Sequence, residues 1–264
     1  GVGNSYGYAV ALADDYLAVG DYDEPGASRN DTVWLYNLTN LTLINRFYGI
    51  NYGDLFGKSV LISYPYLVVA SPGYGINQMG RVVVYHVDTG ELIWTDHSNL
   101  SPDRRYHGIL IKGDKLIYTT SGVHNRSNIM VFTQHLIDGS SSKSLFNYSI
   151  DPHNSYTGNM VVVEDHLLIG DHTYGNGSGI IHTVALNPND QTKSVRPHIV
   201  SPLGPKYAVS FGTFLGVTQL ASNLLIVGAS LGAKSVSAIY ILDLTCSLTP
   251  DCWSDALVKW IMSG

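Results

Sequence analysis

The 264-residue chain is poor in charged residues: Asp, Glu, Lys and Arg make up only 14% of it, and the formal net charge is −6. Lys and Arg total 15 and form no basic stripe, so the electrostatic footprint of a nucleic-acid-binding protein is missing. No apolar run reaches the roughly 18 residues that a membrane-spanning helix needs. The sequence begins without an initiator Met or a signal peptide, and we expect a processed form or a fragment.

Sequence signatures of common enzyme and metal sites are also missing. The ten His residues are scattered, and no two share the short spacing of a metal-binding pair, so no zinc site is expected. No Ser-His-Asp order, phosphate-binding Gly-rich loop or sialidase Asp-box is present. We therefore predict no catalytic residues, no cofactor and no bound metal, and we do not expect an enzyme.

What the chain does have is an internal repeat. The segment YGYAVALADDYLAVGDY at Tyr6 returns as FGKSVLISYPYLVVASP at Phe56, and weaker copies begin at Tyr106, Tyr156 and Phe214. One leucine marks the second apolar run of each copy and recurs about every 50 residues: Leu17, Leu67, Leu116, Leu167 and Leu225. A period of this size indicates stacked or radial units that bury their apolar faces against their neighbours.

Each unit contains four strand signals and no sustained helical period. In the second unit these are residues 60–63, a Tyr64-Pro65 turn, residues 67–70, residues 81–87, a turn at residues 88–90, and residues 91–95. The first two strands of each unit are almost wholly apolar, as expected for strands covered on both faces. The sequence therefore predicts an all-β fold, a five-bladed β-propeller of four-stranded antiparallel blades. A parallel β-solenoid is the rival fold, but its rungs are usually shorter and need no hairpin turns.

We predict a single domain over residues 1–264, with blades at about 1–50, 51–100, 101–150, 151–202 and 203–264. Outer strands are expected near residues 41–47, 91–95, 143–150, 193–199 and 256–262. Only five residues precede Tyr6, too few to supply a full outer strand to the last blade. Closure should then depend on face-to-face packing of the first and fifth blades.

The repeated pattern [FY]-G-x-[SA]-V, followed by L-[VA]-V-[GA]-[DSA] and then G-x-V-x-V-Y, resembles the FG-GAP repeats of integrin α-subunit propellers. The resemblance covers nearly the whole chain and is weakest in the third unit, where Arg105-Tyr106 replaces the Phe-Gly pair. Many such repeats carry a calcium-binding loop between the first two strands. Here that position holds only short turns, which cannot surround a calcium ion with oxygens, so the chain resembles the metal-free variety of the repeat.

Seven Asn-x-Ser/Thr sequons predict N-glycosylation, and none falls on a predicted inner strand, where a glycan would not fit. They are Asn30, Asn37, Asn40, Asn99, Asn125, Asn147 and Asn176. Pro102 directly after the Asn99 sequon makes that site the poorest acceptor. The sequons predict a secreted, extracellular protein, although an Asn-rich chain with accidental sequons is the alternative.

The only two cysteines, Cys246 and Cys252, are too far apart for a redox Cys-x-x-Cys motif and have no metal-binding companions. In a glycosylated chain an even count predicts a local disulfide bond, here in the turn before the last strand.

Loops that follow the second strand of every blade should gather on one face, at residues 21–25, 72–75, 121–124, 171–175 and 230–233. Their aromatic and imidazole side chains form the candidate ligand-binding set: Tyr22, Tyr74, His124, His172 and Tyr174. Rigid scaffolds usually carry binding sites on such loops. The alternative is that Gly, Pro and Asp serve the turns while Tyr covers the blade ends. Asp21 and Asp23 are interpreted as a solvated acidic turn, since no third ligand follows at metal-loop spacing.

We therefore expect a non-enzymatic extracellular glycoprotein domain for adhesion or assembly, such as the repeating subunit of a filament or coat. A lectin or receptor ectodomain that binds a glycan or a protein through the loop face is the first alternative. A five-bladed glycosidase is the second, although the inner strands lack the paired carboxylates that it needs. Residues 256–262 form an apolar outer strand, so Trp260 and Ile261 are the predicted contact with a protein partner or a second copy.

Overall fold

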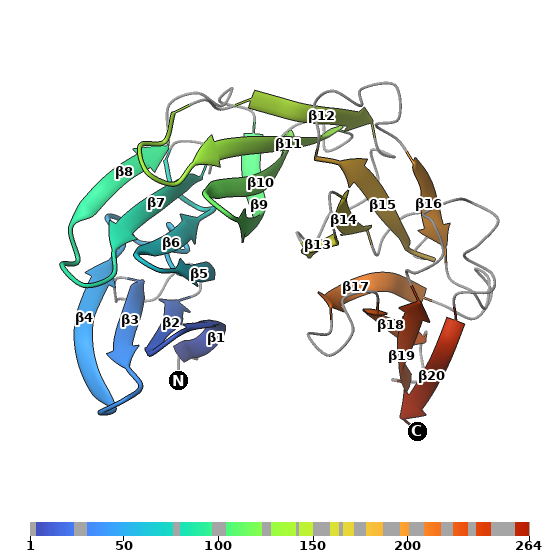
Figure 1. The fold of residues 1–264 in the computed structure, drawn as a ribbon, viewed down its shortest axis with the longest axis horizontal. Helices are drawn as coiled ribbons and strands as arrows, with labels where there is room; N and C mark the ends of the chain where they lie inside the picture. The colour runs from blue at the N-terminus through green and yellow to red at the C-terminus, as the bar shows by residue number, and fades with distance from the viewer. Residues whose placement is uncertain are drawn as a thin grey trace. The chain divides into compact units, whose positions relative to one another are not determined.

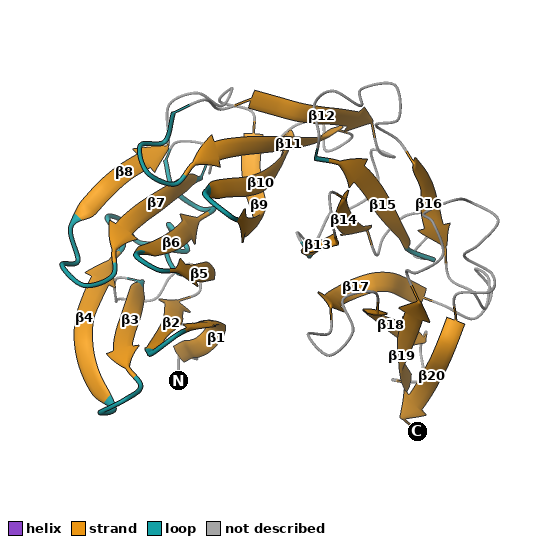
Figure 2. Cartoon of the chain, in the orientation of Figure 1, coloured by secondary structure: helices purple, strands orange, loops and turns teal. Residues whose placement is uncertain are grey.

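A computed structural model describes residues 4–23, 31–75, 80–96, 104–122, 128–140, 143–149, 159–163, 166–171, 178–186, 196–200, 209–217, 224–231, 236–243 and 257–263. These residues form β-strands and turns, and no helix occurs among them (Figures 1 and 2). It follows that no helix of the described chain is long and apolar enough to cross a membrane.

Twenty strands form five antiparallel sheets of four, each built from strands consecutive in sequence. The first sheet has β1 (Asn4–Ala13), β2 (Tyr16–Asp23), β3 (Thr32–Asn37) and β4 (Thr42–Tyr48). The second has β5 (Ser59–Ser63), β6 (Tyr66–Ser71), β7 (Arg81–His86) and β8 (Leu92–Asp96). The third has β9 (Arg104–Lys112), β10 (Lys115–Gly122), β11 (Asn128–His135) and β12 (Lys143–Ser149).

The fourth sheet has β13 (Met160–Val163), β14 (His166–Asp171), β15 (Ile180–Ala185) and β16 (Arg196–Val200). The fifth has β17 (Val209–Val217), β18 (Leu224–Leu231), β19 (Val236–Asp243) and β20 (Leu257–Ser263). The predicted outer strands coincide with β4, β8, β12, β16 and β20 to within a few residues, which confirms the four-strand repeat. The chain divides into two compact units, Gly1–Asn125 with Met130–Ser144, and Arg126–Ile129 with Leu145–Gly264.

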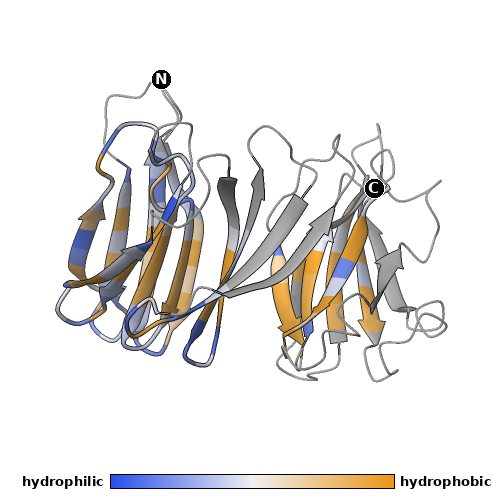
Figure 3. Ribbon diagram, turned by 90° about the horizontal axis from the view of Figure 1, so that it is seen from above, coloured by the Kyte–Doolittle hydropathy of each residue, from blue (hydrophilic) through white to orange (hydrophobic). Residues whose placement is uncertain are grey.

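Strand β6 shows why the second apolar run of the repeat is continuous. Leu67 and Val69 belong to a core shared with the first sheet, whereas Val68 and Ala70 belong to a core shared with the third. All four side chains are at most 3% exposed. Because successive strand residues point to opposite faces, only a strand covered on both sides can bury such a run. Each fully buried Val or Leu contributes about 1.5–3 kcal/mol. Figure 3 shows the same distribution, with hydrophobic residues along the strands and hydrophilic ones at many turns.

One backbone hydrogen bond recurs in the first three sheets and ties the third turn to the first hairpin. Leu38 N donates to Asp15 O at 2.7 Å, Val87 N to Pro65 O at 2.8 Å, and Leu136 N to Asp114 O at 2.8 Å. Val87 and Leu136 are buried. The repeat seen in the sequence is therefore a repeat of turn geometry as well as of strand composition.

Two glycines bring the first and second sheets into backbone contact. Phe56 is fully buried, and its backbone N donates to the buried carboxylate of Asp31 at 3.0 Å. Gly57 follows with a φ of +86°, and its carbonyl oxygen lies where a Cβ on Gly20 would be. A Cβ on Gly57 itself would lie 2.7 Å from Cγ2 of Val33. The Phe-Gly pair of one repeat thus packs on the glycine that ends the second apolar run of the preceding repeat.

One sequence-based expectation is wrong for the first sheet. Strand β2 extends to Asp23, so Tyr22 lies on a strand and not in the loop, because Asn4–Tyr6 pairs with Asp21–Asp23 beyond a bulge. Within its own unit, the inner strand β1 is covered on one face. Its outward residues Tyr6, Tyr8, Val10 and Leu12 are 52–66% exposed, whereas Ala11 is buried against the second sheet.

The glycine contact predicts a position-specific cost of adding one methyl group. Gly20→Ala should lower the free energy of unfolding by about 3 kcal/mol, because the new Cβ meets a backbone oxygen that cannot rotate away. Gly113→Ala is the control: its site has a φ of +59° and no neighbour within 4 Å, so only about 1 kcal/mol of backbone strain is expected. Chemical denaturation of both variants measures the difference. Equal losses would contradict the glycine contact.

Candidate binding surface

The structure describes two of the five predicted ligand-binding residues. Tyr22 is half-buried and makes an edge-to-face contact with Tyr8, with ring centroids 4.7 Å apart. Tyr74 is half-buried in the turn after β6, where its backbone O accepts from Gly80 N at 2.9 Å. Tyr22 lies near the end of β2 and Tyr74 follows β6, so both residues lie at the ends of second strands in successive sheets. His124, His172 and Tyr174 lie outside the described residues.

Arg81, which sequence reasoning missed, lies directly beside Tyr74. The residue opens β7 and is only 6% exposed. Its guanidinium carbon lies 4.3 Å from the ring centroid of Tyr74 and 5.8 Å from that of Phe56. Burial raises the pKa of the nearby Tyr85 hydroxyl, and the positive charge of Arg81 partly opposes this rise. The sequence signal that could have identified this residue is a single Arg at the start of the otherwise apolar run Arg81–Val87.

The outward face of the first sheet is aromatic. Trp34 and Tyr6 are in edge-to-face contact at 6.2 Å, and the Arg46 guanidinium lies 4.0 Å from the Trp34 ring centroid. The hydroxyls of Tyr6 and Tyr36 are hydrogen-bonded at 3.1 Å, which raises the pKa of Tyr6 to about 12. Together with Tyr8, Val10 and Leu12 these residues make a large apolar surface, and surfaces of this kind usually mark a contact.

The opposite, hairpin end carries a carboxylate held by two tyrosines. The hydroxyls of Tyr16 and Tyr64 donate to the Asp88 carboxylate at 2.6 and 3.0 Å, and the two rings stack with centroids 5.9 Å apart. The hydrogen bonds lower the pKa of Asp88, and the bond to Asp88 raises the pKa of Tyr16 to about 12. Tyr16 comes from the first sheet and the other two from the second, so the cluster joins two sheets.

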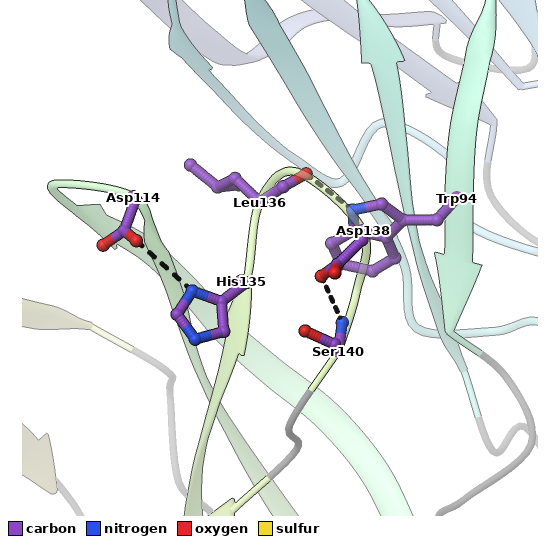
Figure 4. Close-up of polar contacts among 6 residues, drawn as sticks. All are labelled: Trp94, Asp114, His135, Leu136, Asp138 and Ser140. Carbon is purple, nitrogen blue, oxygen red and sulfur yellow. Dashed lines mark hydrogen bonds and ion pairs between the residues drawn. The ribbon is translucent and has the colours of Figure 1, made fainter.

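A further contact joins the second and third sheets at the same end (Figure 4). Trp94 Nε1 donates to Leu136 O at 2.7 Å, and the Trp94 ring closes over Gly139, where a Cβ would lie 2.9 Å from Cδ2. Beside it, Asp114 Oδ2 lies 3.3 Å from His135 Nδ1, and the hydrogen bonds of Ser140 lower the pKa of Asp138. The exposed carboxylates of Asp114 and Asp138 therefore stabilise the conformation of their turns.

Two predicted glycosylation sites lie next to each other: Asn37 ends β3, and Asn40 lies in the turn between β3 and β4. Asn37 Oδ1 accepts from Thr39 N at 2.9 Å, and Asn40 Oδ1 accepts from Thr42 N at 3.2 Å. Each asparagine thus bonds the backbone of its own sequon threonine through the oxygen, as in an Asx-turn. Asn40 is exposed and Asn37 half-buried. Their amide nitrogens, the atoms to which an N-glycan is attached, have no partner among the described residues.

The remaining predicted sites are only partly described. Asn147 lies on the outer strand β12, as expected. Outside the described residues lie Asn30, Asn99, Asn125 and Asn176, together with Cys246 and Cys252. No group of three His, Cys, Asp or Glu residues within the described ranges could hold a metal ion.

One acid–histidine pair occurs in the fourth sheet, where His182 Nε2 lies 3.6 Å from Asp171 Oδ2. Both residues are at most 2% exposed. A catalytic His-Asp pair must meet its substrate, and this pair is enclosed in the sheet packing. It therefore does not form a solvent-accessible site.

The predicted contact residues Trp260 and Ile261 lie on β20, the outer strand of the fifth sheet. Ile261 is opposite Ile239, whose side chain is 45% exposed, and Trp260 is opposite Tyr240, which is fully buried. Directly opposed residues of antiparallel strands share a face. The register thus aligns Ile261 with an exposed position of β19 and Trp260 with a buried one.

No family model and no curated protein matches the chain. Among solved structures, the Dos1 propeller matches with a TM-score of 0.61 and 14% identity over 96% of this chain and 61% of that chain. A europium-containing methanol dehydrogenase matches with a TM-score of 0.55 and 11% identity over 96% of this chain and 61% of that chain. A structure from a study of two prolyl endopeptidases matches with a TM-score of 0.55 and 14% identity over 97% of this chain and 34% of that chain.

The chain thus spans at most 61% of the length of these three structures. At such low identities they show the fold alone, which is all-β and propeller-like. Two of the three names are those of enzymes, so the fold is compatible with enzymes as well as with binding proteins.

The tyrosine–carboxylate cluster predicts a pH-dependent contribution to stability. Because the folded-state pKa of Asp88 is lowered, its contribution is present above the ordinary carboxyl pKa and is lost as the pH falls through the folded value. Asp88→Asn should therefore lower the melting temperature most at neutral pH and progressively less towards about pH 3. Asp14→Asn, which removes an exposed charge from the same end without touching either tyrosine, is the control. A pH-independent offset for Asp88→Asn would refute the assignment.

Proposed function

We propose that this chain is a non-enzymatic, extracellular glycoprotein domain that serves adhesion or assembly, built as a closed five-bladed propeller of metal-free FG-GAP-type repeats. Five four-stranded sheets and propeller-like structural neighbours support the architecture. The contact of Gly57 with Gly20 supports the assignment to FG-GAP-type repeats. Through it, the Phe-Gly pair at the start of one repeat packs on the glycine of the Gly-Asp pair at the end of the second apolar run of the repeat before it.

The observation that carries the extracellular assignment is the geometry of the Asn37 and Asn40 sequons. Asn37 ends β3 and Asn40 lies in the turn that follows; each bonds its own threonine through Oδ1, and each leaves Nδ2 without a partner among the described residues. The nitrogen atoms that an N-glycan would be attached to are therefore not used by the turn. Two glycans at this turn would cover the outer rim of the first sheet, so protein contacts would have to use other surfaces.

The aromatic face of the first sheet supports closure. Within its unit, β5 packs against β1 and β2, and β9 packs against β5 and β6; in the other unit, β17 packs against β13, β14 and β15. Within each unit a sheet thus gives one face to the next sheet in the sequence, and the first sheet has no preceding sheet in its unit. In the proposed ring the fifth sheet covers Tyr6, Tyr8, Val10 and Leu12.

The outer strand β20 is the proposed assembly contact. Its edge faces no further strand among the described residues, and its sequence Leu257–Ser263 carries a single charge, that of Lys259. An apolar edge strand is a template for pairing with a strand of another chain. Exposed Ile239, opposite Ile261, extends this apolar edge onto the sheet surface.

The lectin or receptor alternative is favoured by one observation, the half-buried Tyr74 on the loop face beside a buried arginine. The glycosidase alternative has no comparable support, since the described inner strands bring no pair of carboxylates to a common solvent-exposed site. A glycan array separates the lectin from the assembly subunit, which should bind no array glycan and should self-associate.

Glycosylation is tested by intact mass. In protein from a secreting eukaryotic host, Thr39→Ala and Thr42→Ala should each remove the mass of one glycan, from Asn37 and Asn40 respectively. Thr39→Ser, which preserves the sequon, should leave the mass of the glycan in place. An enzyme that removes N-glycans should abolish the differences between these variants. A wild-type mass unchanged by that enzyme would reject both the glycans and the secreted assignment.

Assembly is tested by light scattering of purified protein. Ile261→Lys should raise the dissociation constant for self-association by about tenfold or more, because it places a charge at the apolar edge. Ile44→Lys, on the outer strand β4 of the first sheet, is the matched control and should assemble as the wild type does. Trp260→Glu, at the other predicted contact residue, should weaken self-association in the same way. Unchanged association of Ile261→Lys would place the contact elsewhere.

A further inference from the structure

Arg81 is a buried cation with no counter-charge among the described residues. Its exposure is 6%, and no atom of the described chain forms a hydrogen bond with its Nε. No carboxylate of the described chain makes an ion pair with it. The two buried carboxylates of the neighbouring turns serve the backbone instead: Asp31 accepts from Phe56 N, and Asp54 accepts from Asn51 N at 2.9 Å. Arginine is seldom buried without a partner, because loss of hydration strongly penalises an unpaired charge.

The two aromatic rings account for only part of this arrangement. The guanidinium carbon lies over the rings of Tyr74 and Phe56, at 4.3 and 5.8 Å from their centroids. A contact with an aromatic ring gives the guanidinium N–H groups no acceptor oxygen, and these groups are the ones that bind anions. The aromatic contacts and the 6% exposure mean that the guanidinium is already held in place and largely without its hydration. Both effects lower the free-energy cost of binding an anion at its edge.

We propose that Arg81, with Tyr74 as its platform, forms a binding site for a carboxylate group. A carboxylate matches the planar fork of the guanidinium with two parallel hydrogen bonds. A phosphate or sulfate dianion is less suited, because a single cation faces it here and the chain carries a net charge of −6. Half-buried Tyr74 and exposed Gly75 form the adjoining turn, so the ligand approaches from the loop face.

The site deepens the proposed function, and its physiological role depends on that function, because an adhesive domain needs a residue that recognises its ligand. The carboxylate can come from an acidic sugar or from an acidic amino-acid side chain. Both sources present the same group to Arg81, and the two arms of the experiment separate them. The mass and light-scattering tests above do not involve Arg81, so failure of the proposed function and failure of this site are distinguishable.

The test is the melting temperature of the purified protein, with affinities from calorimetry. Methyl glucuronoside is the sugar arm and N-acetylglutamate amide the amino-acid arm. Methyl glucoside and N-acetylglutamine amide are their uncharged controls. At least one carboxylate should raise the melting temperature of the wild type while its control does not, and the larger rise identifies the source. No rise with either carboxylate would overturn the proposal.

Substitutions assign the binding to Arg81. Arg81→Met keeps the packing volume and should abolish the response, and Arg81→Lys should weaken the affinity about tenfold, because it keeps the charge and loses the fork. Arg46→Met is the matched control: Arg46 also stacks on an aromatic ring, that of Trp34, but is exposed, and the response should persist. A response that survives Arg81→Met would overturn the proposal.

A measurement on the wild type covers the case in which Arg81→Met does not fold. In an NMR spectrum of the arginine Nε–Hε groups, one signal that exchanges slowly with solvent should shift when the carboxylate is added. The same signal should not shift when the uncharged control compound is added. The same signal should be missing in Arg81→Lys. Unshifted arginine signals would assign Arg81 a purely structural role and refute the site.

Discussion

The close approach of Gly20 and Gly57 sets how the first two sheets meet. The carbonyl oxygen of Gly57 occupies the space that a side chain at Gly20 would need. Gly57 itself must be glycine because its φ is +86° and Val33 leaves no room for a Cβ. The buried Phe56 ring and the Asp31 carboxylate, which accepts the Phe56 N–H, hold the two backbones at this distance. Because this contact fixes the spacing of the sheets, the alternate residues of β6 can pack into two separate cores.

Because the sheets pack through their faces, the turns at the two ends of the strands can differ in sequence and in contacts. At the hairpin end, tyrosine–carboxylate and tryptophan–carbonyl contacts join neighbouring sheets, and two glycosylation sequons lie at the surface. At the loop end, Arg81 is buried beside Tyr74 and Phe56, and its guanidinium is the charged group that the proposed site uses. The packing of the two sheets and the candidate site thus both depend on Phe56, and a substitution of Phe56 should perturb both.

Strand positions could be predicted from the sequence because they depend on local pattern: Leu67 to Ala70 is apolar without a break, and Tyr64-Pro65 makes the turn before it. The environments of single side chains could not be predicted from local pattern. Tyr22 was assigned to a loop because the pairing of Asn4–Tyr6 beyond a bulge has no local signal. The burial of Arg81 arises from Phe56, 25 positions earlier, and from Tyr74 across a turn. The exposure of Tyr8 and Leu12 likewise depends on which sheet lies next to β1.

The central claim is that identical sheet contacts repeat until the chain closes on itself. Electron cryo-microscopy of the purified, glycosylated protein tests this claim most directly. The account predicts five four-stranded blades around one channel, with Tyr6, Tyr8, Val10 and Leu12 covered by the sheet that ends in β20. A ring with a sixth blade, or an open stack in which that face of β1 meets solvent, would contradict it.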